Sequence, residues 1–318
     1  MTTFRQKRYI NPYTDFGFKK LFGTEMNKDL LISFLNALFF QAGDAGQEAH
    51  RPHSPIRDIT YLPTEHFGTF GNRRAIFDVY CEDEDGGKFI VEMQNVFQQF
   101  YKDRSVFYAT FPIQEQAKVG EDFDFNLKEV YTVGILNFTF RDDEASDEVC
   151  HRQVKLMDTR TKRVFYDKLT FIYLEMPKFN KTEDELVTMF DKWLFVLKNL
   201  SQLFDRPAAL QERIFTKLFE QAEIARFTPD ERRSYEDSVK TYRDINNAIA
   251  TARREEHEKG RAEGRAEGRA EGEHAKALQV ARTLKGMGLS AEQIVQATGL
   301  TTEEINKLEI TSVMMNET

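Results

Sequence analysis

The segment Ile76–Gln94, IFDVYCEDEDGGKFIVEMQ, constrains the fold of this chain more than any other. Apolar and polar side chains alternate on both sides of its Asp-Gly-Gly tripeptide, residues 85–87. Side chains of a strand point to opposite faces with period two, and glycines supply the positive φ angles of a tight turn. The segment therefore predicts a β-hairpin. One face is expected to pack on the core through Phe77, Val79, Cys81, Phe89, Val91 and Met93.

The other face of this predicted hairpin carries two acidic residues, Asp78 and Glu92, together with Gln94. Counting from the turn places the two acids opposite each other within about one residue of register. Adjacent carboxylates repel, and a divalent cation that takes oxygen ligands relieves the repulsion. The alternative is an exposed strand face with ordinary surface acids. Tyr80 and Ile90 share this face, which favours a partly covered site.

The hairpin and the N-terminus together carry a family resemblance. An aspartate near the end of one strand, followed by Glu-x-Gln in the next, resembles the PD-(D/E)XK nuclease motif (Asp78, Glu92 and Gln94). The segment Asn11–Gly23, NPYTDFGFKKLFG, is similar to the opening signature of the Rpn family, a group of recombination-promoting nucleases and transposase-related proteins. The Glu-Gly-Arg repeat of the tail is also typical of that family, so the resemblance covers essentially the whole chain.

The resemblance implies a fold and a function. The fold is α+β with α/β-like character, a restriction-endonuclease-like core whose mixed central sheet is flanked by helices, followed by a helical C-terminal region. The function is a Mg²⁺-dependent DNA endonuclease that promotes recombination, with Mn²⁺ or Ca²⁺ as alternative ions. Asp78, Glu92 and the backbone carbonyl of Met93 would bind the metal. The alternatives are a transposase-related accessory protein that binds DNA without cleaving it, and an inactive interaction module.

Gln94 departs from the wider superfamily, in which lysine usually follows Glu-x. Glutamine can hydrogen-bond a nucleophilic water but brings no positive charge. We expect the next helix, Gln98–Val119, to supply the cation through Arg104. Tyr108 lies four residues later, on the same helical face, and is a candidate for substrate binding. The alternative role of Arg104 is a surface salt bridge.

Asp15 and Lys19 are further candidates near the N-terminus. Asp15 begins a predicted helix, Asp15–Phe40, where an N-cap aspartate is the expected residue, so capping is the alternative to a catalytic role. Lys19 follows one turn later, where it either approaches the phosphate of the substrate or is solvated.

Periodicity predicts the remaining elements of the core. Strands are expected at Arg57–Phe67, Val130–Phe140, Gln153–Asp158 and Leu169–Met176. The nearly continuous apolar run of Val130–Phe140 favours a buried central position in the sheet. Helices follow from Lys181, and the repeat of large apolar residues around Trp193 is typical of core packing.

Four segments are predicted, namely a nuclease-like core at 1–178, a helical extension at 179–256, a tether at 257–274 and a small helical tail at 275–318. The tether contains GRAEGRAEGRAEG, in which glycines weaken a helix that alanine, arginine and glutamate favour. Ser290 and Thr301 precede Gln293 and Glu304 by three residues, as capping boxes require. Three short helices are therefore expected in the tail, similar to a helix-turn-helix that contacts DNA or, alternatively, another protein.

Composition limits the setting of the protein. The two cysteines have no metal-type spacing and fit a reducing compartment, so we expect a cytoplasmic protein. No stretch approaches the roughly 20 apolar residues of a membrane helix, so no membrane partner is expected. A net charge of −8 disfavours a protein that coats DNA passively but is compatible with a nuclease that has local basic patches. DNA is the expected partner, and a homodimer is the alternative to a monomer.

Overall fold

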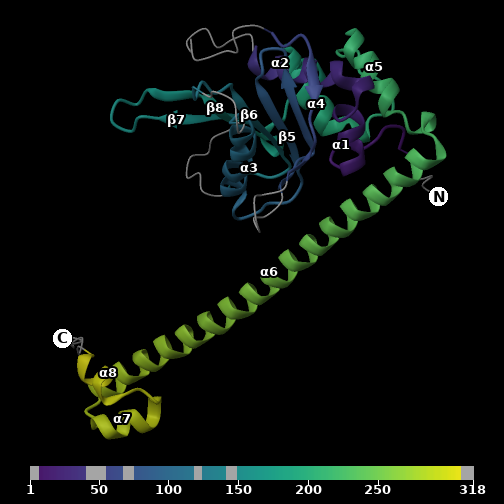
Figure 1. Ribbon diagram of the computed structural model, residues 1–318. Coiled ribbons are helices and arrows are strands. Elements are labelled where there is room, and N and C mark those ends of the chain that lie inside the picture. Colours follow the sequence, from purple (N-terminus) through teal and green to yellow (C-terminus); the bar gives the residue numbers. More distant parts are fainter. Residues whose placement is uncertain (1–6, 41–54, 67–74, 118–123, 141–148, 309–318) are drawn as a thin grey trace, which may run out of the picture. The chain divides into compact units, whose positions relative to one another are not determined.

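A mixed six-stranded sheet organises the first part of the chain (Figure 1). The computed structural model describes residues 7–40, 55–66, 75–117, 124–140 and 149–308. These residues fall into two compact units, Met1–Arg243 and Asp244–Thr318. The division into four segments that the sequence suggests stays a prediction.

The order of the strands in the sheet is β1-β4-β5-β6-β8-β7. Three central strands, β5, β6 and β8, run parallel, and the remaining pairs are antiparallel. Every residue of β6 is buried, as the apolar run predicts for a central strand. The strands of this sheet are β1 (Ile59–Tyr61), β4 (Val79–Asp83), β5 (Lys88–Gln94), β6 (Val130–Leu136), β7 (His151–Met157) and β8 (Val164–Glu175). A separate pair is formed by β2 (Glu65–His66) and β3 (Ala75–Ile76).

Helices cover both faces of the sheet. One face packs against α1 (Asp15–Phe22), α2 (Lys28–Phe39), α4 (Met189–Asn199) and α5 (Arg213–Ala222) in a single hydrophobic core. The other face packs against α3 (Tyr101–Glu115). This arrangement confirms the α+β fold with a mixed central sheet between helices.

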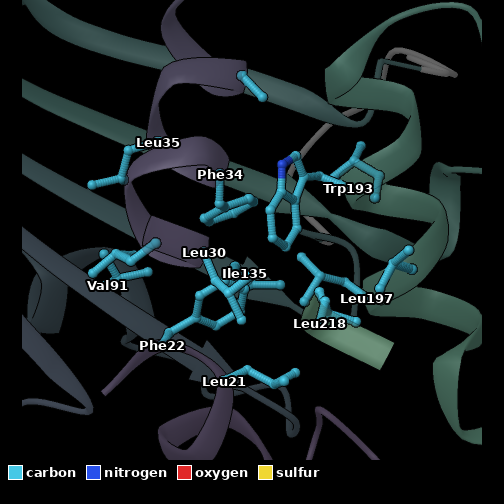
Figure 2. Packing of buried hydrophobic residues seen from close by; sticks show 14 of the residues in the cluster. Leu21, Phe22, Leu30, Phe34, Leu35, Val91, Ile135, Trp193, Leu197 and Leu218 are labelled. Carbon is cyan, nitrogen blue, oxygen red and sulfur yellow. The ribbon is translucent and has the colours of Figure 1, made fainter. Parts of the chain in front are cut away.

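Aromatic side chains form the centre of the larger core (Figure 2). The indole of Trp193 is fully buried, and its centroid lies 5.8 Å from Phe22, 5.7 Å from Phe34 and 5.2 Å from Phe215. Edge-to-face and tilted contacts at this spacing stabilise a core beyond the area that they bury. The expected packing role of Trp193 is thereby confirmed.

The single helix expected at Asp15–Phe40 is two helices. α1 ends at Phe22, and Gly23 caps it with an N–H that donates to the carbonyl of Lys19 (2.8 Å). A short 3₁₀ turn (Glu25–Asn27) then leads into α2. Gly23 and Thr24, which has extended backbone, interrupt the apolar period between the two helices.

Two expected strands also differ from their predictions. Arg57–Phe67 is divided into β1 and β2, with Phe67 outside the described residues. In the hairpin, Phe77 packs with Tyr80 and Ile90 on the face that α3 covers, not with Val79 on the opposite face. The cause is a bend at Asp78, which separates β3 from β4 and shifts the alternation by one residue.

The helix predicted at Gln98–Val119 is observed as α3, Tyr101–Glu115, and Val119 lies outside the described residues. The β-strands predicted at Gln153–Asp158 and Leu169–Met176 correspond to β7 and β8. Both are longer toward their N-terminal ends than periodicity indicated. The extra length of β8, Val164–Lys168, pairs with the C-terminal end of β7 in a hairpin.

The C-terminal part is helical. A helix of 58 residues, α6 (Pro229–Gly286), includes the Glu-Gly-Arg repeat, so the first of the three helices expected in the tail is the end of a long one. Two short helices follow, α7 (Ala291–Thr298) and α8 (Thr302–Lys307), and both capping boxes are present. Within the described residues, we find no helix that combines the length and the apolarity needed to cross a membrane.

Candidate metal and active site

Backbone amides of the hairpin hold the carboxyl groups of both acids. The β4–β5 pairing ends at Val79 and Val91, and beyond it the amide of Met93 donates to Oδ2 of Asp78 (2.8 Å). The amide of Asp78 donates to Oε1 of Glu92 (3.2 Å). The bend at Asp78 thus replaces ladder contacts by side-chain contacts, and it holds both carboxyl groups next to each other and to the backbone of Met93.

Arg104 reaches this pair from α3. Its Nη2 donates to Oε2 of Glu92 (2.7 Å), while Nη1 donates to Gln98 (2.9 Å) and lies 3.4 Å from Oε1 of Gln94. The guanidinium also stacks over the ring of Tyr108, with Cζ 4.9 Å from the centroid. The helix therefore places a delocalised cation beside the hairpin acids, as the spacing of Arg104 and Tyr108 suggested.

The side chain of Gln94 is oriented by a neighbouring backbone group. Its amide nitrogen donates to the carbonyl of Val96 (3.0 Å). This bond leaves the amide oxygen as an acceptor that lies 3.4 Å from Nη1 of Arg104. An acceptor in that place can take a hydrogen bond from a water molecule, which is the part that glutamine can play where it replaces lysine.

Burial raises the pKa of both acids. For Glu92, which is 4% exposed, burial and the charge of Asp78 raise the pKa to about 8, against the lowering effect of Arg104. For Asp78, burial raises the pKa, and the Met93 amide and the charge of Lys19 oppose the shift. Two carboxyls that resist simultaneous ionisation need a proton or a cation between them. Arg104 supplies one positive charge to Glu92, and a metal ion beside Asp78 would supply a further one.

A close contact between Gly134 and Tyr101 holds α3 against the sheet next to Glu92. Gly134 of β6 lies opposite Glu92, and a Cβ at Gly134 would stand 2.6 Å from the hydroxyl of Tyr101. Ser105, one turn after Tyr101, shares a hydrogen bond of 2.7 Å with the hydroxyl of Tyr173 on β8. Only glycine leaves room for this approach of helix to strand. The contacts position the turn of α3 that carries Arg104.

The start of α1 lies close to the site. The side-chain amide of Asn95, next to Gln94, donates to the carbonyl of Tyr13. Lys19 lowers and Asp15 raises the pKa of Asp78, so their charges act on that carboxyl. Asp15 and Lys19 form an exposed ion pair of 2.7 Å.

The expected capping role of Asp15 is taken by its neighbour. Thr14 is the N-cap of α1, and its hydroxyl accepts from the amide of Gly17 (3.0 Å). Asp15 is the first residue of the helix, where a negative charge suits the helix dipole.

Comparison with known proteins assigns the chain to a family. The model of the PD-(D/E)XK nuclease family transposases matches residues 12–252. The chain belongs to this family. No curated protein and no solved structure matches the chain. The matched region contains every candidate site residue and carries a nuclease- or transposase-related function. Members of the superfamily generally use divalent metal ions.

The acidic pair offers a partial donor set for a metal in this PD-(D/E)XK protein. Among the described residues, no group of three or more His, Cys, Asp or Glu side chains is arranged to hold a metal. Oδ1 of Asp78 accepts no hydrogen bond from any described residue, however, and Glu92 is adjacent to it. Oxygen donors of this kind, completed by water and a phosphate, suit a hard divalent cation. The residues fit such an ion.

Sequence reasoning missed four residues of the site, Asn95, Gln98, Tyr101 and Gly134. Gly134 gave the clearest signal, because a glycine inside an apolar strand indicates a close approach of another element. Tyr101 and Gln98 could be placed only after the position of α3 on the sheet was known.

Proposed function

We propose that this protein is a Mg²⁺-dependent DNA endonuclease that hydrolyses phosphodiester bonds and promotes recombination. The observation that carries the proposal is the pair formed by buried Glu92 and half-buried Asp78, whose pKa values are raised and whose carboxyl groups adjoin the backbone of Met93. An acidic pair with this burial is costly to the fold, so a function is the best reason for its presence.

Asp78, Glu92 and the carbonyl of Met93 would hold the metal ion. When bound, Mg²⁺ supplies a Lewis acid for the phosphate and lowers the pKa of a water ligand. Gln94 accepts a hydrogen bond from the attacking water and so orients it. Arg104 offers the positive charge that lysine gives elsewhere in the superfamily, and it can pair with a phosphate oxygen as well as with Glu92.

Three peripheral residues complete the proposal. Tyr108 stacks on Arg104 and limits the directions that the guanidinium can take. Lys19 would bring a second positive charge toward the substrate backbone, and Asp15 would tether Lys19. Asp15 and Lys19 are exposed, so their contributions should be smaller than those of the buried residues.

A plasmid-nicking assay with Mg²⁺, Mn²⁺, Ca²⁺ or EDTA tests the proposal. We expect nicking with Mg²⁺ that EDTA abolishes, and a loss of more than about 100-fold in Asp78→Ala because a metal ligand is removed. Glu82→Gln is the matched control, since Glu82 lies on the same hairpin but pairs with Lys88. Nicking by Asp78→Ala at the wild-type rate would remove the hypothesis.

The same assay separates the accessory alternative. The contact between Arg104 and Glu92 favours an accessory protein that binds DNA without cleaving it, because the guanidinium already neutralises part of the charge of the acidic pair. A wild-type protein that binds DNA but cuts with none of the three ions would be the accessory protein. In that case Asp78→Ala should leave binding unchanged.

A further inference from the structure

A two-stranded arm extends from the edge of the sheet (Figure 1). β6 begins at Val130, opposite Leu169 of β8, so the part of β8 from Val164 to Lys168 has β7 as its partner among the described strands. At the base of the arm, Nζ of Lys168 donates to Oδ1 of Asn126 (2.9 Å) and to the carbonyl of Leu127 (2.7 Å). The arm is therefore fastened where it leaves the sheet.

The tip of the arm has a defined shape. Oδ1 of Asp158 accepts from the amides of Arg160 (2.8 Å) and Thr161 (2.9 Å), and the amide of Asp158 donates to the carbonyl of Arg163 (2.9 Å). These amide contacts lower the pKa of Asp158. Lys162 adopts a positive φ of 58°, which closes the turn. The acidic side chain of the tip is thus occupied by the backbone.

The arm is basic in an acidic protein. The projecting residues, 156–168, contain four Lys or Arg and two Asp residues, whereas the whole chain has a net charge of −8. Arg160, Lys162 and Arg163 are exposed, and no salt bridge joins any of them to an acid among the described residues. Phe165, next to this group, is 81% exposed. An unpaired basic tip with an exposed aromatic ring indicates a polyanionic partner.

We propose that the β7–β8 arm binds duplex DNA through phosphate contacts of Arg160, Lys162 and Arg163; this inference rests on the proposed function for the identity of the polyanion. A two-stranded β-ribbon fits the major groove, and Phe165 on one strand can contact sugar or base edges. A second copy of this chain fits less well, since two arms of the same positive charge repel each other.

The distance from tip to acidic site sets the length of DNA required. Glu92, Gly134 and Tyr173 lie in one row across β5, β6 and β8. Val164 precedes Tyr173 along β8 by a length on the order of 30 Å, at about 3.3 Å per residue. A duplex that contacts both places must span roughly nine base pairs, at about 3.4 Å per pair. Shorter duplexes should lose the contribution of the arm.

The test measures binding of a labelled duplex of about 30 base pairs by anisotropy, in EDTA, between about 50 and 200 mM salt. In full-length protein, Arg160→Gln/Lys162→Gln/Arg163→Gln should weaken binding by more than about tenfold and reduce the salt slope by about 2–3. The charge-conserving variant Arg160→Lys/Lys162→Arg/Arg163→Lys should bind nearly as well as wild type. The matched control Arg261→Gln/Arg265→Gln/Arg269→Gln removes the same charge from exposed sites of α6 and should leave binding unchanged.

Several outcomes would overturn the arm proposal. These are wild-type affinity in the triple variant, equal loss in the α6 control, absence of duplex binding by wild type, or a change of oligomeric state in the triple variant, which would assign the arm to a second copy. Thermal unfolding at the wild-type midpoint checks that each variant is folded. If the wild type binds the duplex through the arm but does not nick it, the proposed function is wrong and the arm proposal stands. If the wild type nicks DNA and the triple variant binds as tightly as wild type, the arm proposal is wrong and the proposed function stands.

Discussion

In two hairpins of the same sheet, an aspartate accepts hydrogen bonds from the amides of the turn, but the two hairpins carry charges of opposite sign. In the β4–β5 hairpin, Oδ1 of Asp83 accepts from the amides of Asp85 (3.0 Å) and Gly87 (2.7 Å). In the β7–β8 hairpin, Oδ1 of Asp158 accepts from the amides of Arg160 and Thr161 in the same way. The first hairpin lies inside the sheet between helices and carries buried Glu92 beside half-buried Asp78, and the second projects from the edge and carries exposed bases. Position in the sheet, more than local sequence, decides which charges a hairpin can use.

The difference separates chemistry from attachment. Burial raises the pKa values of Asp78 and Glu92 and so prepares that hairpin for a cation. Exposure leaves the charges of the arm available to a partner but screened by salt. Variants of the first hairpin should therefore change cleavage with little effect on DNA binding, and variants of the arm should do the opposite.

The largest effect expected beyond the acids themselves is that of Arg104→Met. It removes the contacts with Glu92 and Gln94 and leaves the acids without a nearby cation, so nicking should fall by about 100-fold or more. Arg104→Lys should recover only part of this, because an ammonium cannot make the same forked contacts. Single-turnover nicking rates measure the loss, and duplex anisotropy should remain near the wild-type value. A fully active Arg104→Met would show that the guanidinium serves only the fold.

A smaller effect is expected at the contact behind the site. Gly134→Ala puts a methyl group against the hydroxyl of Tyr101 and displaces α3, so nicking should fall between about 10- and 100-fold. Tyr101→Phe removes the hydroxyl, and the double variant should regain most of the rate. The control is Gly264→Ala, since a Cβ there meets nothing within 4 Å. Failure of the second change to rescue the first would contradict this account of the contact.

The smallest effects are expected from removing the aspartate of each turn, Asp83 in the β4–β5 hairpin or Asp158 in the β7–β8 hairpin. Asp83→Ala leaves amides of a half-buried turn without an acceptor and should lower the free energy of unfolding by about 1–3 kcal/mol. Asp158→Ala, at an exposed tip, should leave the midpoint of thermal unfolding almost unchanged while weakening duplex binding slightly. Calorimetry and anisotropy on both variants measure the contrast. Equal destabilisation by the two changes would mean that the arm is part of the cooperative core.

The sequence predicted the turn, the facing acids and the central strand because each depends on local alternation or local turn chemistry. It did not predict the bend at Asp78, since the alternation of Phe77 and Val79 is equally good for a straight strand. The contact of Tyr101 with Gly134 depends on how a helix packs on a strand far away in the chain. The arm was missed for a related reason: its residues alternate weakly, and only the pairing of β7 with β8 shows that they project.

Binding of Mn²⁺ to the full-length protein, followed by calorimetry as a function of pH, tests the acidic pair most directly. Because burial raises the pKa of Glu92 to about 8, this carboxyl must release a proton to ligate a metal. We expect wild type to bind one ion with an affinity that rises with pH and levels off above about 8, and Asp78→Asn to lose that binding. Equal, pH-independent binding by wild type and Asp78→Asn would contradict a cation held jointly by Asp78 and Glu92.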